Sequence, residues 1–217
     1  APYNAVLTHG FVQDEQGRKM SKSLGNTVTP QEIIAQNGAD ILRLWVANSD
    51  YYDDLRIGKE IIQRQVDHYR RLRNTLRYLL GSLNGFAEAE KVDIGDMPQL
   101  ERWVLMRLKE LDIQIRAAAA EHDYHHIFTL LHHFCNNDLS AFYFDIRKDM
   151  LYCGDTNSIE RRACRTVMDT LFNTLVVWLA PILSFTAEEA WQNRYPDPDY
   201  SVHFAVFPDL PEGWLDE

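Results

Sequence analysis

Four stretches with helical apolar periodicity, separated by short breaks, constrain this chain more than any other feature. In the first stretch, apolar residues recur every three or four positions from Ile62 to Leu83, which places them on one face of a helix. The same spacing recurs over 100–115, 128–146 and 164–178. Four amphipathic helices with short links bury their apolar faces against one another, so the sequence predicts a bundle of antiparallel helices over residues 51–217.

The residues expected to face inward follow directly from this spacing. They are Ile62, Val66, Tyr69, Leu72, Leu76, Leu79 and Leu83 in the first helix, Leu100, Val104, Leu108, Leu111 and Ile115 in the second, Phe128, Leu131, Cys135, Leu139, Phe142 and Ile146 in the third, and Cys164, Val167, Leu171, Leu175 and Trp178 in the fourth. Asp123 is expected to cap the third helix. A capping box at 186–189 predicts a further short helix, and 201–204 reads as an extended tail.

Residues 1–50 have a different pattern, which predicts a small mixed α/β piece. An alternating run ends at Val12, a polar turn follows at 14–17, and Thr29-Pro30-Gln31-Glu32 forms a capping box with proline at the first helical position. A second helix is expected from Ala39 to Asn48. The predicted fold class is therefore mainly α, with an α/β piece over 1–50 and a helical bundle over 51–217.

Composition places the chain among ordinary globular proteins, with 46% hydrophobic and 25% charged residues. The longest apolar run, 175–185, is short and contains Pro181, so no membrane partner is expected. The start has neither a signal peptide nor a Met, which suggests a piece of something longer. Three cysteines without a CxxC pair argue against disulfides and favour the cytoplasm.

The net charge of −10 is unfavourable for a nucleic-acid partner, but the charge is unevenly distributed. Residues 1–80 carry 11 basic and 9 acidic side chains, a net charge of +2, which leaves −12 for the remainder. Any contact with nucleic acid should therefore favour the first part, or a local basic patch in the second.

The segment Arg18 to Asn26 carries two lysines on a loop between extended structure and a helix start. An ammonium group is a compact charge on a flexible stem and suits phosphate oxygens. Two lysines three residues apart, on a loop that serine and glycine leave mobile, can close over a polyphosphate and stabilise charge on leaving pyrophosphate. Lysines on loops are common, so the residues alone leave a solvated basic turn as the alternative.

The string Lys19-Met20-Ser21-Lys22-Ser23 matches the KMSKS signature of class I aminoacyl-tRNA synthetases. Residues 38–45 resemble the helix that follows this loop in the isoleucine, valine and leucine subgroup, while 143–149 and 179–189 resemble that subgroup's helical anticodon-binding domain. Leu24-Gly25-Asn26 after the signature is more similar to isoleucyl-tRNA synthetase than to the valine enzyme. Valyl- and leucyl-tRNA synthetases stay open as alternatives.

This resemblance implies a fragment of an enzyme that activates isoleucine with ATP and transfers it to tRNA(Ile). Residues 1–50 would be the C-terminal part of the catalytic domain, and 51–217 the anticodon-binding domain. The residues implied to bind ATP, which arrives with Mg²⁺, are Lys19, Met20, Ser21, Lys22 and Ser23. Lys22, with Lys19, would stabilise the transition state. The other class I signature, HIGH, is absent from the chain, so the fragment alone is expected to be inactive and to hold no cofactor tightly.

Five arginines lie on the first long helix, mostly off its apolar face: Arg64, Arg70, Arg71, Arg73 and Arg77. A guanidinium contacts phosphate through a bidentate fork. Without the resemblance, a solvated helix face explains them equally well. With it, we expect contacts to the tRNA backbone that position the RNA without reading its sequence.

Two further clusters have both a structural and a chemical interpretation. The third helix carries His122, His125, His126, His132, His133 and Cys135, and a spacing of four would suit a metal ion. No glutamate completes an HExxH motif, so no metal is predicted. Asp145, Arg147, Lys148 and Asp149 are predicted to form ion pairs within the bundle rather than a catalytic set. The rival function is a non-catalytic helical RNA-binding module whose lysine loop is only a surface turn.

Overall fold

The structure is a computed structural model that describes residues 2–216. It divides into two compact units, residues 1–69 and 70–217. Helix α3 (Lys59–Ser82) begins in the first unit and ends in the second. The boundary predicted after residue 50 differs from this division and stays a prediction.

The first unit combines two short helices with a small parallel sheet. Strand β1 (Val12–Gln13) pairs with β2 (Leu55–Arg56), and between them lie α1 (Pro30–Asn37) and α2 (Ala39–Ala47). The capping box of α1 is confirmed, because the Thr29 hydroxyl accepts from the Glu32 amide and the Glu32 carboxylate accepts from the Thr29 amide. Buried side chains of α2, including Leu44 and Trp45, form much of the core.

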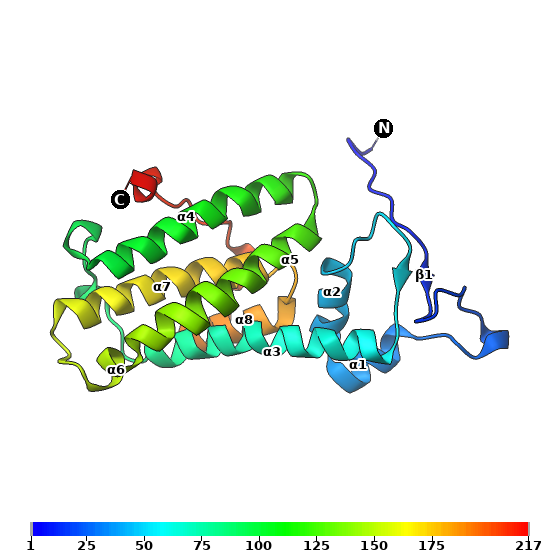
Figure 1. Ribbon diagram of the computed structural model, residues 1–217, viewed down its shortest axis with the longest axis horizontal. Helices are drawn as coiled ribbons and strands as arrows, with labels where there is room; N and C mark the ends of the chain where they lie inside the picture. The colour runs from blue at the N-terminus through cyan, green and yellow to red at the C-terminus, as the bar shows by residue number, and fades with distance from the viewer. Residues whose placement is uncertain (1, 217) are drawn as a thin grey trace. The chain divides into compact units, whose positions relative to one another are not determined.

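The second unit is the predicted helical bundle. Its helices are the rest of α3, α4 (Gln99–Ala120), α5 (Tyr124–His133), α6 (Phe144–Cys153), α7 (Ile159–Leu179) and α8 (Ser184–Arg194). Helix α4 packs against α5 and α7, and α7 also packs against α6 and α8. Figure 1 shows α4, α7 and α5 lying side by side. Short 3-10 turns connect or end these helices at Glu88–Glu90, Ile94–Asp96, Val202–Phe204 and Glu212–Asp216.

The predicted apolar face of the third helix is correct only in its first part. Residues Phe134–Tyr143 form a π-helical segment between α5 and α6. Its hydrogen bonds reach five residues along the chain, which shifts the phase of every later side chain. Phe142 and Ile146 are therefore 43% and 48% exposed, and Tyr143 and Phe144 are buried in their place. In the fourth helix, α7, all five predicted inward-facing residues are buried.

The predicted capping box at 186–189 is wrong. Helix α8 begins earlier, at Ser184, without a side-chain cap. The Glu188 carboxylate instead accepts hydrogen bonds from the Ser201 hydroxyl at 2.7 Å and the Val202 amide at 3.0 Å. These bonds fold the chain into a 3-10 turn, Val202–Phe204, where an extended tail was expected.

The three cysteines occupy different environments. Cys135 and Cys164 are buried in the bundle, and burial raises the pKa of each thiol to about 12. Cys153, at the end of α6, is exposed. Within residues 2–216, no helix combines the length and apolarity needed to cross a membrane.

A buried ion pair links α4 to α6. The Glu101 carboxylate of α4 is fully buried and accepts from Arg147 of α6 through Nε at 2.7 Å and Nη2 at 2.6 Å. It also lies 3.2 Å from the Tyr143 hydroxyl, which lies 3.3 Å from the Cys164 sulfur of α7. The expected ion pairing of Arg147 is confirmed, with a partner 46 residues away.

Replacing Glu101 by glutamine is expected to lower the free energy of unfolding by about 2–4 kcal/mol, because Arg147 keeps its charge without a counter-charge. The matched control is Asp145→Asn, which breaks the exposed pair with Lys148. This substitution should change the free energy of unfolding by under about 1 kcal/mol. Urea unfolding followed by circular dichroism measures both. Equal effects would show that the buried pair does not stabilise the bundle.

Candidate functional site

The lysine loop forms a single 3-10 turn, Lys22–Leu24, on the first unit. Ser21 caps this turn, since its hydroxyl accepts from the Leu24 amide at 3.3 Å and lies 3.1 Å from the Ser23 hydroxyl. Gly25 closes the turn with φ 64°, a left-handed conformation that glycine adopts without a steric penalty. Lys19 and Lys22 are both exposed, so their ammonium groups are accessible to a ligand.

The base of this loop is organised by the buried carboxylate of Asp14. Its Oδ1 accepts from the amides of Arg18 at 2.8 Å and Gln16 at 3.0 Å. Its Oδ2 accepts from Arg18 Nε at 2.8 Å and Asn26 Nδ2 at 2.9 Å. One carboxylate therefore joins the turn before the loop to the residue after it.

Asn26 connects the two ends of the loop. Its Nδ2 also donates to the Lys19 carbonyl at 3.2 Å, and its Oδ1 accepts from the Ser21 amide at 2.9 Å. The loop is thus fastened at its base by side chains, and the two lysines extend from a fixed turn.

Hydrogen bonding to its charged form lowers the pKa of Asp14 to about 2. The bond from Asn26 is the largest cause, burial acts in the opposite direction, and the bonds and charge of Arg18 lower the pKa further. Asp14 therefore stays ionised at neutral pH and remains an acceptor for all four donors.

Sequence reasoning missed Asp14, Asn26 and Glu15 as parts of this site. Glu15 Oε1 accepts from the Glu60 amide at 2.9 Å, in the first turn of α3. Gly58 makes this approach possible, because a Cβ there would overlap the Glu15 side chain. The available signals were the polar turn at 14–17 and the asparagine after Gly25, but neither identifies its partner.

The five predicted arginines are all exposed. Arg64 belongs to the first unit, and the others belong to the second. At about 100° per residue, Arg70, Arg73 and Arg77 lie within a sector of about 60° on α3, while Arg71 lies about 100° from Arg70. The four arginines of the second unit therefore form one row of three and a separate single residue.

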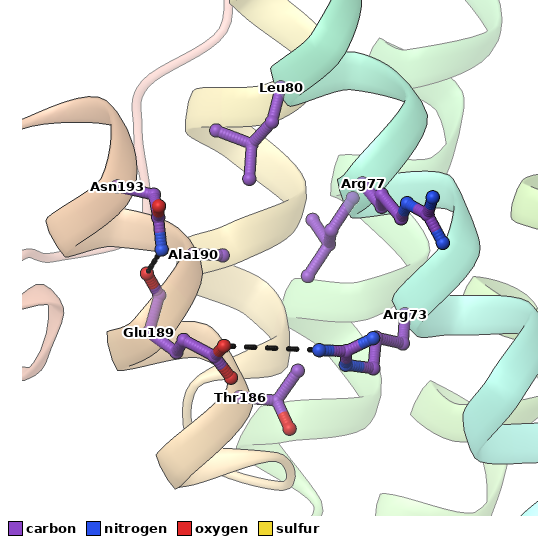
Figure 2. Close-up of a pocket in the computed structure, with 8 residues that line it drawn as sticks. Arg73, Arg77, Leu80, Thr186, Glu189, Ala190 and Asn193 are labelled. Atoms are coloured by element: carbon purple, nitrogen blue, oxygen red, sulfur yellow. Dashed lines mark hydrogen bonds and ion pairs between the residues drawn. The ribbon is translucent and has the colours of Figure 1, made fainter.

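Part of this row borders a cavity of about 150 Å³ between α3 and α8 (Figure 2). Arg73 Nη2 lies 3.8 Å from Glu189 Oε1, an ion pair between exposed side chains. Arg77 also lines this cavity. The Asn193 side chain donates to the Glu189 carbonyl at 2.8 Å. An exposed pair of this kind contributes little to stability, so Arg73 can exchange Glu189 for another anion.

The histidine cluster does not form a compact site. Cys135 is buried, while His122, His125, His126 and His133 are exposed. Within residues 2–216, no group of three His, Cys, Asp or Glu side chains could hold a metal ion. Of the charged set at 145–149, Arg147 serves the buried pair and Lys148 bonds Asp145 at 2.8 Å.

Comparisons with known families cover both units. Residues 101–217 match the family described as the anticodon-binding domain of tRNA ligase, and residues 1–58 match tRNA synthetases class I (I, L, M and V). The isoleucine–tRNA ligase of Ruegeria pomeroyi is 57% identical over 215 residues, which are 99% of this chain and 22% of that protein. The isoleucine–tRNA ligase of Agrobacterium fabrum is 54% identical over 217 residues, 100% of this chain and 22% of that protein. The chain thus spans about a fifth of the length of these relatives.

Solved structures share the fold. A Mycobacterium tuberculosis methionyl-tRNA synthetase in complex with methionyl-adenylate has a TM-score of 0.73 at 18% identity, covering 94% of this chain and 40% of that one. The LeuRS of an Agrobacterium radiobacter LeuRS–tRNA–LeuAMS ternary complex has a TM-score of 0.70 at 20% identity, covering 95% and 24%.

Asn26→Ala is expected to raise the pKa of Asp14 from about 2 toward the ordinary value of about 3.9, because the largest stabilising bond to the carboxylate is lost. Since the folded pKa is lowered, the carboxylate stabilises the loop above the unfolded pKa, and this contribution is lost as pH falls through about 2. Carboxyl carbon NMR titration measures the shift. Asn37→Ala, at an exposed position of α1, is the control, and an unchanged Asp14 pKa in the Asn26 variant would contradict the assignment.

Proposed function

Because the chain belongs to the class I tRNA synthetases that carry an anticodon-binding domain, we propose that it is a segment of an isoleucine–tRNA ligase. The full-length enzyme activates isoleucine with ATP to an adenylate and transfers the aminoacyl group to tRNA(Ile) in the cytoplasm. The amino acid is proposed from identities of 53–57% to isoleucine–tRNA ligases over nearly the whole chain. This segment contributes the phosphate-binding loop and part of the tRNA-binding surface.

The observation that carries this proposal is the Lys19-Met20-Ser21-Lys22-Ser23 loop on its fastened base. Lys19 and Lys22 bind the ATP phosphates, and Lys22 acts most directly on the charge of the leaving pyrophosphate. Ser21 and Ser23 shape the turn and offer hydroxyls, and Met20 lies between the lysines. The Asp14 carboxylate is fully engaged by its four donors, so Mg²⁺ arrives with ATP rather than on this loop.

Exposed arginines of α3 supply the proposed contacts to the tRNA backbone. Guanidinium groups fit phosphate oxygens bidentately. The exposed ones on α3 belong to Arg64, Arg70, Arg71, Arg73 and Arg77. Their exposure means that they bind RNA without first breaking the bundle core. These contacts position the tRNA, and they carry no base-specific information.

In the full-length enzyme, Lys22→Ala is expected to lower kcat for isoleucine-dependent pyrophosphate exchange by about 100-fold or more, because the lost charge acts mainly in the transition state. The KM for isoleucine should change by less than about threefold. Lys59→Ala, at an exposed lysine of α3, is the control and should leave kcat unchanged. An effect confined to the KM for isoleucine would remove the assigned role.

Replacing Arg70, Arg71, Arg73 and Arg77 together by glutamine is expected to weaken tRNA binding and to reduce its salt dependence by up to about one unit of slope per phosphate contact. Helicity should be unaffected, because all four side chains are exposed. Titrations at several salt concentrations measure both quantities, with Lys148→Gln as a control for one lost exposed cation. Superimposable curves for wild type and the quadruple variant would mean that these arginines are only a solvated face.

A further inference from the structure

A second basic site lies in the acidic part of the chain, where the loop between α6 and α7 meets the 3-10 turn Glu88–Glu90. The cavity there has a volume of about 600 Å³. We name it the arginine cavity, and its polar lining consists of Glu90, Thr156, Asn157, Arg161, Arg162 and Arg165. Figure 1 shows this loop leading into the N-terminal end of α7. Three arginines and one glutamate give the lining a net charge of +2, in a part of the chain whose net charge is −12.

Arg165 is occupied by structural contacts. It pairs with the Glu90 carboxylate, and it donates to the Ser82 carbonyl at 3.2 Å and the Asn84 carbonyl at 2.8 Å. Arg194 of α8 is matched in the same way by Asp169 at 2.7 Å. Both of these arginines therefore have a carboxylate partner.

Arg161 and Arg162 differ, because their partners are neutral. Arg161 Nε donates to the Leu151 carbonyl at 3.2 Å. Arg162 Nε donates to the Glu90 carbonyl at 3.2 Å, and its Nη2 donates to Ala89 and Lys91 carbonyls at 3.4 and 3.3 Å. Over residues 2–216, no carboxylate pairs with either guanidinium, so both Nη groups of Arg161 and Nη1 of Arg162 remain for a ligand.

We propose that the arginine cavity binds a phosphate group of RNA. Two guanidinium groups without a carboxylate partner favour a phosphate, because a planar guanidinium can donate two hydrogen bonds to phosphate oxygens. Their carbonyl contacts hold them in place before binding, which lowers the entropy lost when the ligand arrives. Exposed Thr156 and Asn157 offer a hydroxyl and an amide to the neighbouring sugar. This inference rests on the proposed binding of tRNA and adds a contact remote in sequence from the α3 arginines.

The test uses the full-length enzyme and a tRNA transcript, followed by fluorescence anisotropy at several salt concentrations. Arg161→Gln with Arg162→Gln is expected to lower affinity about tenfold and to reduce the salt slope by up to about two. Isoleucine-dependent pyrophosphate exchange should stay at the wild-type rate, because neither arginine touches the lysine loop. Inorganic phosphate is titrated as a second probe.

A second variant avoids any loss of the backbone contacts. Asn157→Glu adds one negative charge at the exposed rim of the cavity, and Gln114→Glu adds one at an exposed position of α4. Only the first should weaken tRNA binding. If tRNA binding is the same in wild type, the double variant and Asn157→Glu, the RNA contact is overturned.

The phosphate probe separates the sources of the ligand. Arginine-dependent binding of inorganic phosphate without any effect on tRNA would assign the cavity to a free phosphate-bearing ligand and overturn the RNA contact. A wild-type enzyme that does not bind tRNA would refute the proposed function itself. The phosphate titration then decides whether the cavity recognises phosphate at all.

Discussion

One buried carboxylate constrains how the helices of the bundle pack. Glu101 is fully enclosed and receives a two-pronged contact from Arg147, with the Tyr143 hydroxyl beside it. Charges out of water are tolerated only with compensating partners in good geometry, so this carboxylate restricts how α4, α6 and the π-helical segment can pack. Apolar burial provides most of the driving force, but it is not directional. The Glu101–Arg147 ion pair requires a specific geometry, which apolar contacts do not.

The first unit uses the same chemistry near the surface. Asp14 and Lys22 lie eight residues apart, yet one is 5% exposed and the other is exposed to solvent. The Asp14 carboxylate accepts hydrogen bonds from Arg18 and Asn26 of the loop itself. The lysine side chains are exposed to solvent. The side chains of Asp14, Arg18 and Asn26 therefore shape the loop, while the two lysine side chains carry its exposed positive charge.

Local signals were sufficient for much of the fold. The capping box of α1, the Asp123 cap of α5 and the buried face of α7 depend on residues within one or two turns of each other. The resemblance to class I synthetases, carried by a five-residue signature, is confirmed by the family matches. The contacts that sequence reasoning missed join distant residues, such as Asp14 with Asn26 or Glu101 with Arg147. The phase shift within 134–143 was also missed, because the expected spacing assumed α-helical hydrogen bonding throughout.

The three cysteines differ in reactivity, because two of their thiols are buried and one is exposed. Thiolates rather than thiols react with oxidants and alkylating reagents, and a pKa near 12 keeps Cys135 and Cys164 protonated at neutral pH. Cys153 is the exposed one, two residues after Leu151, whose carbonyl accepts from Arg161. Mild alkylation of the folded chain would therefore attach a fluorophore next to the arginine cavity while leaving the core thiols unmodified.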